Sequence, residues 1–251
     1  MRLLLINPNT SAAITDLVVD AARRDASPGV EIVGVTAAFG ARYIGSRSAA
    51  AVAGHAALDA YAAATASGDA YDGAMLACFG DPGLLALRES ADIPIAGMAE
   101  ASCLLACSLG KRFSIITGGE RWGPMLRECV ASIGLTDRLA SVRTVAPSGA
   151  EIAANPDAAY AMLAEACNAA LRDDGADIII LGGAGLLGIA DQIASQVPAP
   201  LIDCMRAAIG SLEAMARAKA MKAAAGPFAK PAPVETIGLS AGLRDLLSRD
   251  S

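Results

Sequence analysis

DIIILGGAGLLG, residues 177–188, contains the pattern that decides the fold. An acidic residue leads into an apolar run of strand length, a glycine-rich turn follows, and small residues and leucines then begin a helix. A similar unit, DGAMLACFGDPGLLA, stands earlier in the chain at residues 72–86. The earlier turn contains Cys78, whereas the later turn has Gly183 at the corresponding place. The repeated unit predicts two similar halves that differ by one thiol.

Short apolar runs alternate with longer helical patterns along almost the whole sequence. Strands are expected at residues 2–7, 30–35, 73–78, 93–97, 112–117, 140–145, 177–181 and 200–204. Helices are expected near residues 10–25, 48–66, 83–91, 99–109, 120–133, 156–173, 186–196 and 204–223. Strands that are apolar on both faces and separated by helices are typical of parallel sheets covered on both sides.

The pattern therefore predicts an α/β fold of two pseudo-symmetric lobes, each a doubly wound parallel sheet of about four strands. We expect residues 1–97 and 205–251 to form the first lobe, with a C-terminal helix and tail, and residues 98–204 to form the second. A last short helix is expected after a cap at Ser240. Ligands of such folds bind at the carboxyl ends of the strands. The active site is therefore expected in the cleft between the two lobes.

The composition is that of a folded globular protein, since 54% of the 251 residues are hydrophobic and 18% are charged. The formal net charge is −6 without a basic stripe, which argues against nucleic acid and favours a small-molecule partner. No run approaches the roughly 18 apolar residues of a membrane span, and the apolar start is too short for a signal peptide. The six cysteines show no paired metal-binding spacing. We expect a cytoplasmic protein with reduced thiols and no metal, and a homo-oligomer because apolar, alanine-rich chains of this kind often associate.

Polar residues follow the first expected strand in the sequence NPNTS. Pro8 ends the strand, and Asn9, Thr10 or Ser11 can cap the next helix. Capping does not require Asn7, whose amide can both donate hydrogen bonds to a ligand and accept them.

The third expected strand ends at Cys78, ahead of Asp81 as an N-cap and Pro82 as the first helical residue. Exposed N–H groups and the positive end of a helix dipole both favour a thiolate. An isolated cysteine is usually structural, but this position makes Cys78 a better candidate for chemistry than the other five cysteines.

The fifth expected strand leads into TGGERW, a turn of small residues. The hydroxyl of Thr117 and the turn amides can hold a carboxylate or a carbonyl group. Trp122, the only tryptophan, is either a core residue or a wall of the cleft. His55 lies in an alanine-rich helical segment and is interpreted as a structural histidine.

A competing motif is GAGLLG, a full G-x-G-x-x-G that starts at Gly183. Asp203 lies 20 residues later, at the end of the next strand. This arrangement matches the dinucleotide fingerprint, in which the acid holds a ribose hydroxyl. Glycine-rich turns are common in α/β proteins, so NAD binding is kept as an alternative.

Several segments together resemble the aspartate/glutamate/hydantoin racemase superfamily, and its hydantoin and allantoin racemase branch in particular. They are INPNT after the first strand, ACFGDPGLLALRE, RFSIITGGER, and a late LGxAG turn followed by PLID. The resemblance covers roughly residues 1–210 in the family's order. It implies two α/β lobes with the site between them and catalysis without a cofactor. It also implies that two cysteines face opposite sides of an acidic carbon, one removing its proton and the other returning one.

By this resemblance Cys78 matches the first catalytic cysteine, and Gly183 occupies the place of the second. The resemblance and the neighbouring sequence place ten residues at the substrate: Asn7, Asn9, Tyr43, Ser46, Arg47, Phe79, Thr117, Gly118, Ala184 and Gly185. Asp81, Glu100 and Asp203 are expected to support these residues from behind. Tyr43, Ser46 and Arg47 stand where the sequence departs from the hydantoin-specific pattern. A guanidinium there favours a substrate that carries a carboxylate.

Glycine has no side chain with which to exchange a proton, so racemisation by two thiols is excluded as the sequence stands. The expected function is a cofactor-independent racemase or isomerase in which Cys78 transfers a proton at the α-carbon of a small carbonyl, carboxylate or hydantoin-like compound. Another residue or a water then acts on the second face. The alternatives are a decarboxylase with a single cysteine, a cis–trans isomerase in which Cys78 is a nucleophile, and a binding protein without catalysis.

Overall fold

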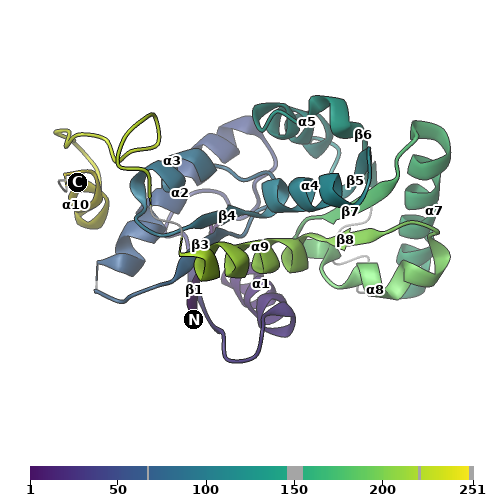
Figure 1. Cartoon of the computed structure of the whole chain (residues 1–251), viewed down its shortest axis with the longest axis horizontal. Coiled ribbons are helices and arrows are strands. Elements are labelled where there is room, and N and C mark those ends of the chain that lie inside the picture. Colours follow the sequence, from purple (N-terminus) through teal and green to yellow (C-terminus); the bar gives the residue numbers. More distant parts are fainter. Residues whose placement is uncertain (67, 146–154, 220–221, 249–251) are drawn as a thin grey trace. The chain divides into compact units, whose positions relative to one another are not determined.

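The structure is a computed structural model that describes residues 1–66, 68–145, 155–219 and 222–248 (Figure 1). Its contacts divide the chain into two compact units. Unit 1 consists of Met1–Ala77, Asp81–Gly97 and Ile209–Ser251, and unit 2 consists of Cys78–Gly80 and Met98–Ala208. The three residues Cys78–Gly80 thus group with unit 2, although the residues on both sides of them group with unit 1.

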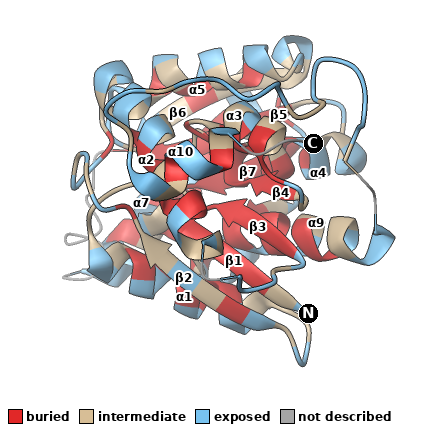
Figure 2. Ribbon diagram, turned by 90° about the vertical axis from the view of Figure 1, so that its left-hand side faces the viewer, coloured by how far each residue is buried: buried red, intermediate tan, exposed pale blue. Residues whose placement is uncertain are grey.

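Unit 1 is built on a parallel sheet in the order β2-β1-β3-β4. The strands are β1 (Arg2–Asn7), β2 (Glu31–Thr36), β3 (Gly73–Leu76) and β4 (Ile95–Gly97). The helices are α1 (Ala12–Asp25), α2 (Arg47–Thr65), α3 (Leu84–Ser90) and α10 (Ala241–Ser248). β1 lies inside the sheet, and residues 3–6 are buried on both faces because helices cover them (Figure 2).

Unit 2 repeats this arrangement with a parallel sheet in the order β6-β5-β7-β8. Its strands are β5 (Phe113–Gly118), β6 (Leu139–Val145), β7 (Ile178–Gly182) and β8 (Leu201–Asp203). Its helices are α4 (Met98–Leu109), α5 (Trp122–Ser132), α7 (Pro156–Asp174) and α8 (Ile189–Ile193). α9 (Cys204–Ala218) begins in unit 2 and ends in unit 1.

The two sheets confirm the predicted α/β fold with two similar lobes, because each sheet has its second, first, third and fourth strands in the same order. β1 has the predicted bounds, residues 2–7. The part of the last long helix predicted at residues 220–221 lies outside the described residues. The predicted cap at Ser240 is confirmed, since its Oγ accepts the N–H of Leu243 at 3.2 Å.

Two local predictions are wrong. Asp81 is not an N-cap and Pro82 does not begin the helix, because Gly83 adopts a left-handed conformation (φ 84°) and is itself the cap of α3. The helix expected at 186–196 is instead a 3₁₀ turn at Ala184–Leu186, the short α8, and a second 3₁₀ turn at Ala194–Gln196.

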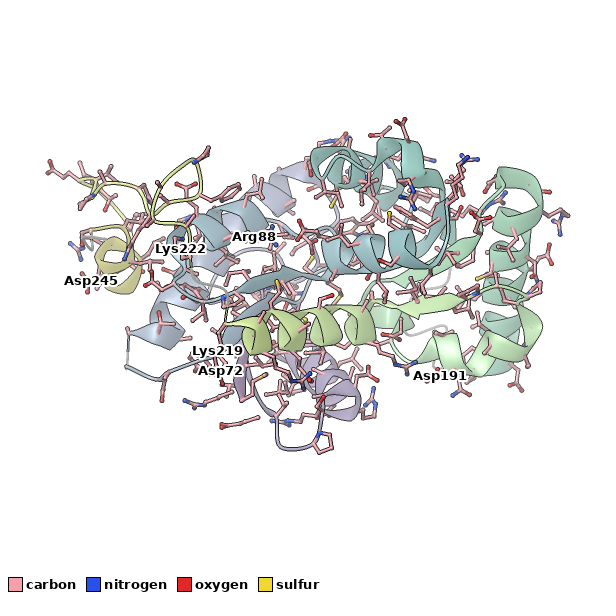
Figure 3. The ribbon with its side chains drawn as sticks, viewed as in Figure 1. Asp72, Arg88, Asp191, Lys219, Lys222 and Asp245 are labelled. Atoms are coloured by element: carbon pink, nitrogen blue, oxygen red, sulfur yellow. The ribbon has the colours of Figure 1, made fainter. Side chains whose placement is uncertain are left out.

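The C-terminal segment is tied to unit 1 by Lys222 and α10. The Lys222 ammonium donates to the carbonyls of Arg88, Glu89 and Ala91 at the end of α3 (Figure 3). Burial lowers the pKa of Lys222 from its usual value. α10 packs on α2, with Leu243 buried in the same cluster as helix residues of α2. Among the described residues, no helix is both long and apolar enough to cross a membrane.

Candidate active site

The loop after β3 carries Cys78. β3 ends at Leu76, and the Ala77 N–H still donates to the carbonyl of Ile6 at 2.8 Å, so the chain leaves the sheet immediately before the cysteine. Cys78 is half-buried and forms no disulfide bond with another described cysteine. The loop therefore presents the thiol beyond the carboxyl end of a parallel strand, where α/β folds bind ligands.

Two aromatic rings fix the residues that follow Cys78. The Phe79 side chain is only 5% exposed, and its ring lies on Gly182, the last residue of β7, so closely that a Cβ there would collide with it. Gly80 packs against Trp122, because an added Cβ would lie 2.5 Å from Cζ3 of the indole. Phe79 was expected at the substrate, but the structure places its ring in the packing between the loop and β7.

The turn after β7 is formed by Gly183. Its backbone has φ 120° and ψ 150°, a region that is essentially restricted to glycine. The Thr117 hydroxyl, which is buried, donates to the carbonyl of Gly182 at 2.8 Å. The Leu186 N–H donates to the carbonyl of Gly183 at 2.9 Å. These bonds hold the turn in place beside Phe79.

The position of the absent side chain at Gly183 is open. A Cβ built there would lie 3.7 Å from Oγ1 of Thr117, and no other atom beyond its chain neighbours comes within 4 Å in the part of the chain that the structure describes. The space that a cysteine side chain would enter is therefore not filled by another residue.

Cys204, which was not among the predicted site residues, lies next to the main chain of the same turn. Burial, followed by the charge of Asp203, raises the pKa of its thiol well above the usual value, while main-chain N–H groups, first that of Gly183, act in the opposite direction. The side chain is completely buried. Cys204 is therefore a neutral thiol that supports the turn. Its position directly after β8, at the first residue of α9, is the sequence feature that could have indicated it.

Asp203 also supports the Gly183 turn. Its carboxylate accepts the N–H groups of Gly188 at 2.6 Å, Met205 at 2.9 Å and Arg206 at 3.3 Å. The dinucleotide interpretation of GAGLLG requires this carboxylate to bind a ribose and the turn to open a long helix. Both requirements fail, because main-chain N–H groups donate to the carboxylate and α8, the α-helix that follows the turn directly, has five residues.

Asn7 organises the NPNTS loop in unit 1. Its Nδ2 donates to Asn9 Oδ1, the Ser11 carbonyl and Thr15 Oγ1 at 2.9 to 3.1 Å, and its Oδ1 accepts the Asn9 N–H at 3.2 Å. The side chain is fully buried. These bonds occupy the Asn7 amide and position the side chain of Asn9. The Nδ2 of Asn9 makes no hydrogen bond to another residue that the structure describes.

The remaining predicted residues of unit 1 lie near helix starts. Ser46 is the N-cap of α2, since its Oγ accepts the Ala49 N–H at 3.2 Å, and its hydroxyl therefore stabilises the start of the helix. Arg47 is the exposed first residue of α2, and Tyr43 is 65% exposed in the preceding loop. Asp81 is buried with its carboxylate against Gly97.

In unit 2, Glu100 is in the first turn of α4, Gly118 ends β5, and Ala184 and Gly185 form the 3₁₀ turn.

Main-chain donors are available on both sides of the Phe79–Gly182 contact. The N–H groups of Phe79, Gly80, Ala184 and Gly185 have no hydrogen-bond partner among the described residues. Preorganised N–H groups of this kind can receive the negative charge that develops on an enolate or a carboxylate. No group of three or more His, Cys, Asp or Glu within the described ranges is placed to hold a metal ion.

The chain is similar to known racemases in sequence and in fold. The model of the Asp/Glu/Hydantoin racemase family matches residues 3–212. A hydantoin racemase of Paenarthrobacter aurescens is 35% identical over 235 residues, 92% of this chain and 98% of the relative. A hydantoin racemase of Pseudomonas sp. (strain NS671) is 34% identical over 81% of each chain. The crystal structure of allantoin racemase from Pseudomonas fluorescens is 32% identical, with a TM-score of 0.88 over 95% of this chain and 100% of that one.

Proposed function

The chain belongs to the Asp/Glu/hydantoin racemase family, and on this premise we propose that it is a racemase-type isomerase in which Cys78 carries the proton. The substrate is a small compound with an acidic α-carbon beside a carbonyl group, in the class of hydantoins and allantoin on which the similar proteins act by name. The enzyme needs no cofactor for this reaction.

The observation that carries the proposal is the place of Cys78. The thiol follows β3 in a loop whose next residue packs on Gly182, and this contact brings the loop beside the Gly183 turn within unit 2. A substrate held by the free N–H groups of both segments has its α-carbon near the thiol. General acid–base transfer by a positioned group contributes typically 10²–10⁴-fold to the rate.

The reaction begins when the thiolate of Cys78 removes the α-proton. The electron pair moves into the neighbouring carbonyl and forms an enolate, whose charge the N–H groups of Phe79, Gly80, Ala184 and Gly185 stabilise. When Cys78 returns the proton, the original enantiomer forms again. On the Gly183 face a water beside Thr117 donates the proton, which gives the opposite enantiomer. The hydroxide left behind is neutralised when Cys78 releases its proton to solvent, and this restores the thiolate.

The open face at Gly183 also favours a second candidate, a decarboxylase with one cysteine. In that reaction carbon dioxide leaves from one face of a disubstituted malonate, and Cys78 protonates the resulting enolate from the other face. Gly183 leaves room on its face for the leaving carboxylate.

The test is a substrate panel followed by optical rotation, with each enantiomer of several 5-substituted hydantoins, allantoin, aspartate and glutamate. Loss of rotation for one of these classes supports the racemase, and carbon dioxide release from an arylmalonate supports the decarboxylase. Inactivation by iodoacetamide should follow alkylation of Cys78, located by peptide mass spectrometry, and substrate should slow it. Inactivation that follows alkylation of Cys107 or Cys129 instead would contradict the proposal.

A further inference from the structure

The loop that carries Cys78 groups with unit 2, although the strand that it follows belongs to unit 1. Ala77 before the loop and Asp81 after it group with unit 1, while Cys78–Gly80 groups with unit 2. Contacts of these three residues with unit 2 therefore contribute to the position of the thiol.

One of these contacts is made by Trp122 on Gly80. An added Cβ at Gly80 would lie 2.5 Å from Cζ3, 3.1 Å from Cη2 and 3.6 Å from Cε3 of the indole. The six-membered part of the ring therefore rests directly on the α-carbon two residues after Cys78. Only glycine permits this approach, since any side chain on that face would push the loop or the ring away.

Trp122 is itself well anchored. It is the first residue of α5, and its N–H donates to the carbonyl of Gly119 at 3.1 Å. α5 is fixed to unit 2 by Leu126 and Val130, which are buried in its core. The indole is half-buried, so one side packs on the loop while part of it remains accessible. A large ring on an anchored helix is a firm support for a loop that has no strand partner of its own.

We propose that Trp122 is a positioning residue for Cys78, whose indole supports Gly80 and thereby holds the thiol within reach of the substrate's α-carbon. This inference rests on the proposed function and names a residue that acts through the loop. Reaction rates depend steeply on such placement, and a displacement of about 1 Å can cost on the order of 10²-fold. Phe79 on Gly182 supports the other side of the loop, so the loss of one ring is expected to displace the thiol without unfolding the protein.

The test compares Trp122→Ala with Trp122→Phe in the whole protein. For Trp122→Ala we expect kcat for racemisation to fall by about 10- to 100-fold, a larger change than that in KM, because the N–H groups of Ala184 and Gly185 stay in place while the thiol is displaced. Trp122→Phe keeps a ring against Gly80 and should recover most of the loss. A kcat within twofold of wild type for Trp122→Ala, with an unchanged alkylation rate of Cys78, would overturn the proposal.

Gly80→Ala disturbs the contact between Gly80 and Trp122 by a change in the loop itself. It tests the positioning role if Trp122→Ala fails to fold. It should lower kcat in the same way, whereas Gly134→Ala, at an exposed glycine of positive φ with nothing within 4 Å of its Cβ, should not. Equal kcat for the two alanine variants would overturn the proposal.

The rate at which iodoacetamide alkylates Cys78 relative to Cys107 separates the positioning role from the proposed function, since it needs no substrate. We expect this ratio to change at least about threefold in Trp122→Ala even if the wild-type protein racemises none of the compounds tested. A changed ratio without any racemase activity in wild type would refute the proposed function and leave the positioning role standing. An unchanged ratio in both Trp122→Ala and Gly80→Ala would refute the positioning role.

Discussion

The turns after β3 and β7 occupy equivalent places in two sheets of the same strand order, yet they differ in what they present. The first turn carries the thiol of Cys78, with aromatic rings packed around its loop. The second has Gly183, whose open side is bordered by Oγ1 of Thr117. The two sheets repeat the same strand order, whereas only the first of these two turns carries a thiol.

Under the proposed mechanism the two faces of a substrate are treated unequally. A proton would move to and from one face through the Cys78 side chain, and to the other face through a water. A mechanism with two thiols would treat both faces alike, so an asymmetry between enantiomers distinguishes the two mechanisms.

The largest expected effect comes from removing the side chain that makes the turns different. Cys78→Ala should lower kcat/KM for racemisation by about 10²–10⁴-fold, because no other side chain takes over its proton transfer. Steady-state polarimetry measures the effect, with Cys107→Ala on α4 as a matched control. If Cys78→Ala retained wild-type activity, the thiol would not be the proton carrier.

Gly183→Cys tests whether the second turn can be made like the first. The added thiol has room beside Thr117, but the backbone at φ 120° must relax, which costs on the order of 1–3 kcal/mol. We expect a lower urea midpoint together with faster inversion relative to exchange with retention. Gly188→Ala, at a left-handed position without neighbours within 4 Å, is the control and should lose less stability.

Thr117→Val tests the support of the second turn alone. The substitution keeps the shape and removes the 2.8 Å hydrogen bond to the buried Gly182 carbonyl, at a cost of about 0.5–1.5 kcal/mol. It should also slow protonation on the Gly183 face more than exchange on the Cys78 face. Urea unfolding and a comparison of the two rates measure these effects, and an equal loss of both rates would argue against a separate role for Thr117.

The smallest expected effect concerns the stability of unit 2 and comes from the ion pair of Arg143 with Asp174, which is not part of the candidate site. The hydrogen bond from Arg143 (2.6 Å from Nε) lowers the pKa of Asp174, so this pair contributes stability above the unfolded-state pKa and loses it as pH falls through the native pKa. Arg143→Met should therefore lower the free energy of unfolding by about 1 kcal/mol near pH 7, with a difference that shrinks below about pH 4. Urea titrations at several pH values measure it, and a constant difference down to pH 2 would contradict the assignment.

The sequence predicts the sheets well and the turns poorly, for physical reasons. β1 is buried on both faces, and an apolar run of this kind predicts a central strand of a parallel sheet from the local sequence alone. The end of the GAGLLG segment could not be predicted in this way, because Gly188 is held by a carboxylate 15 residues later in the chain. Asp81 was predicted as the N-cap because of its residue type, but the left-handed backbone of Gly83 makes Gly83 the cap of α3.

The same distinction applies to the candidate site. Cys78 and Gly183 were recognisable from the repeated turn and from the family resemblance. The contacts of Phe79 with Gly182 and of Gly80 with Trp122 join residues far apart in the sequence, and no periodicity or motif encodes them. The internal bonding of Asn7 is also a product of the folded loop, since its amide type alone suits a ligand equally well.

The most direct test of the asymmetry is proton NMR in D₂O with each enantiomer of the best substrate incubated separately. The account predicts that, for the enantiomer whose α-proton faces Cys78, the α-proton signal disappears with retained chirality faster than inversion occurs. The opposite enantiomer should exchange only as fast as it inverts, and Cys78→Ala should abolish both processes. Equal rates of exchange and inversion for both enantiomers would contradict the account, because they require a second positioned base on the Gly183 face.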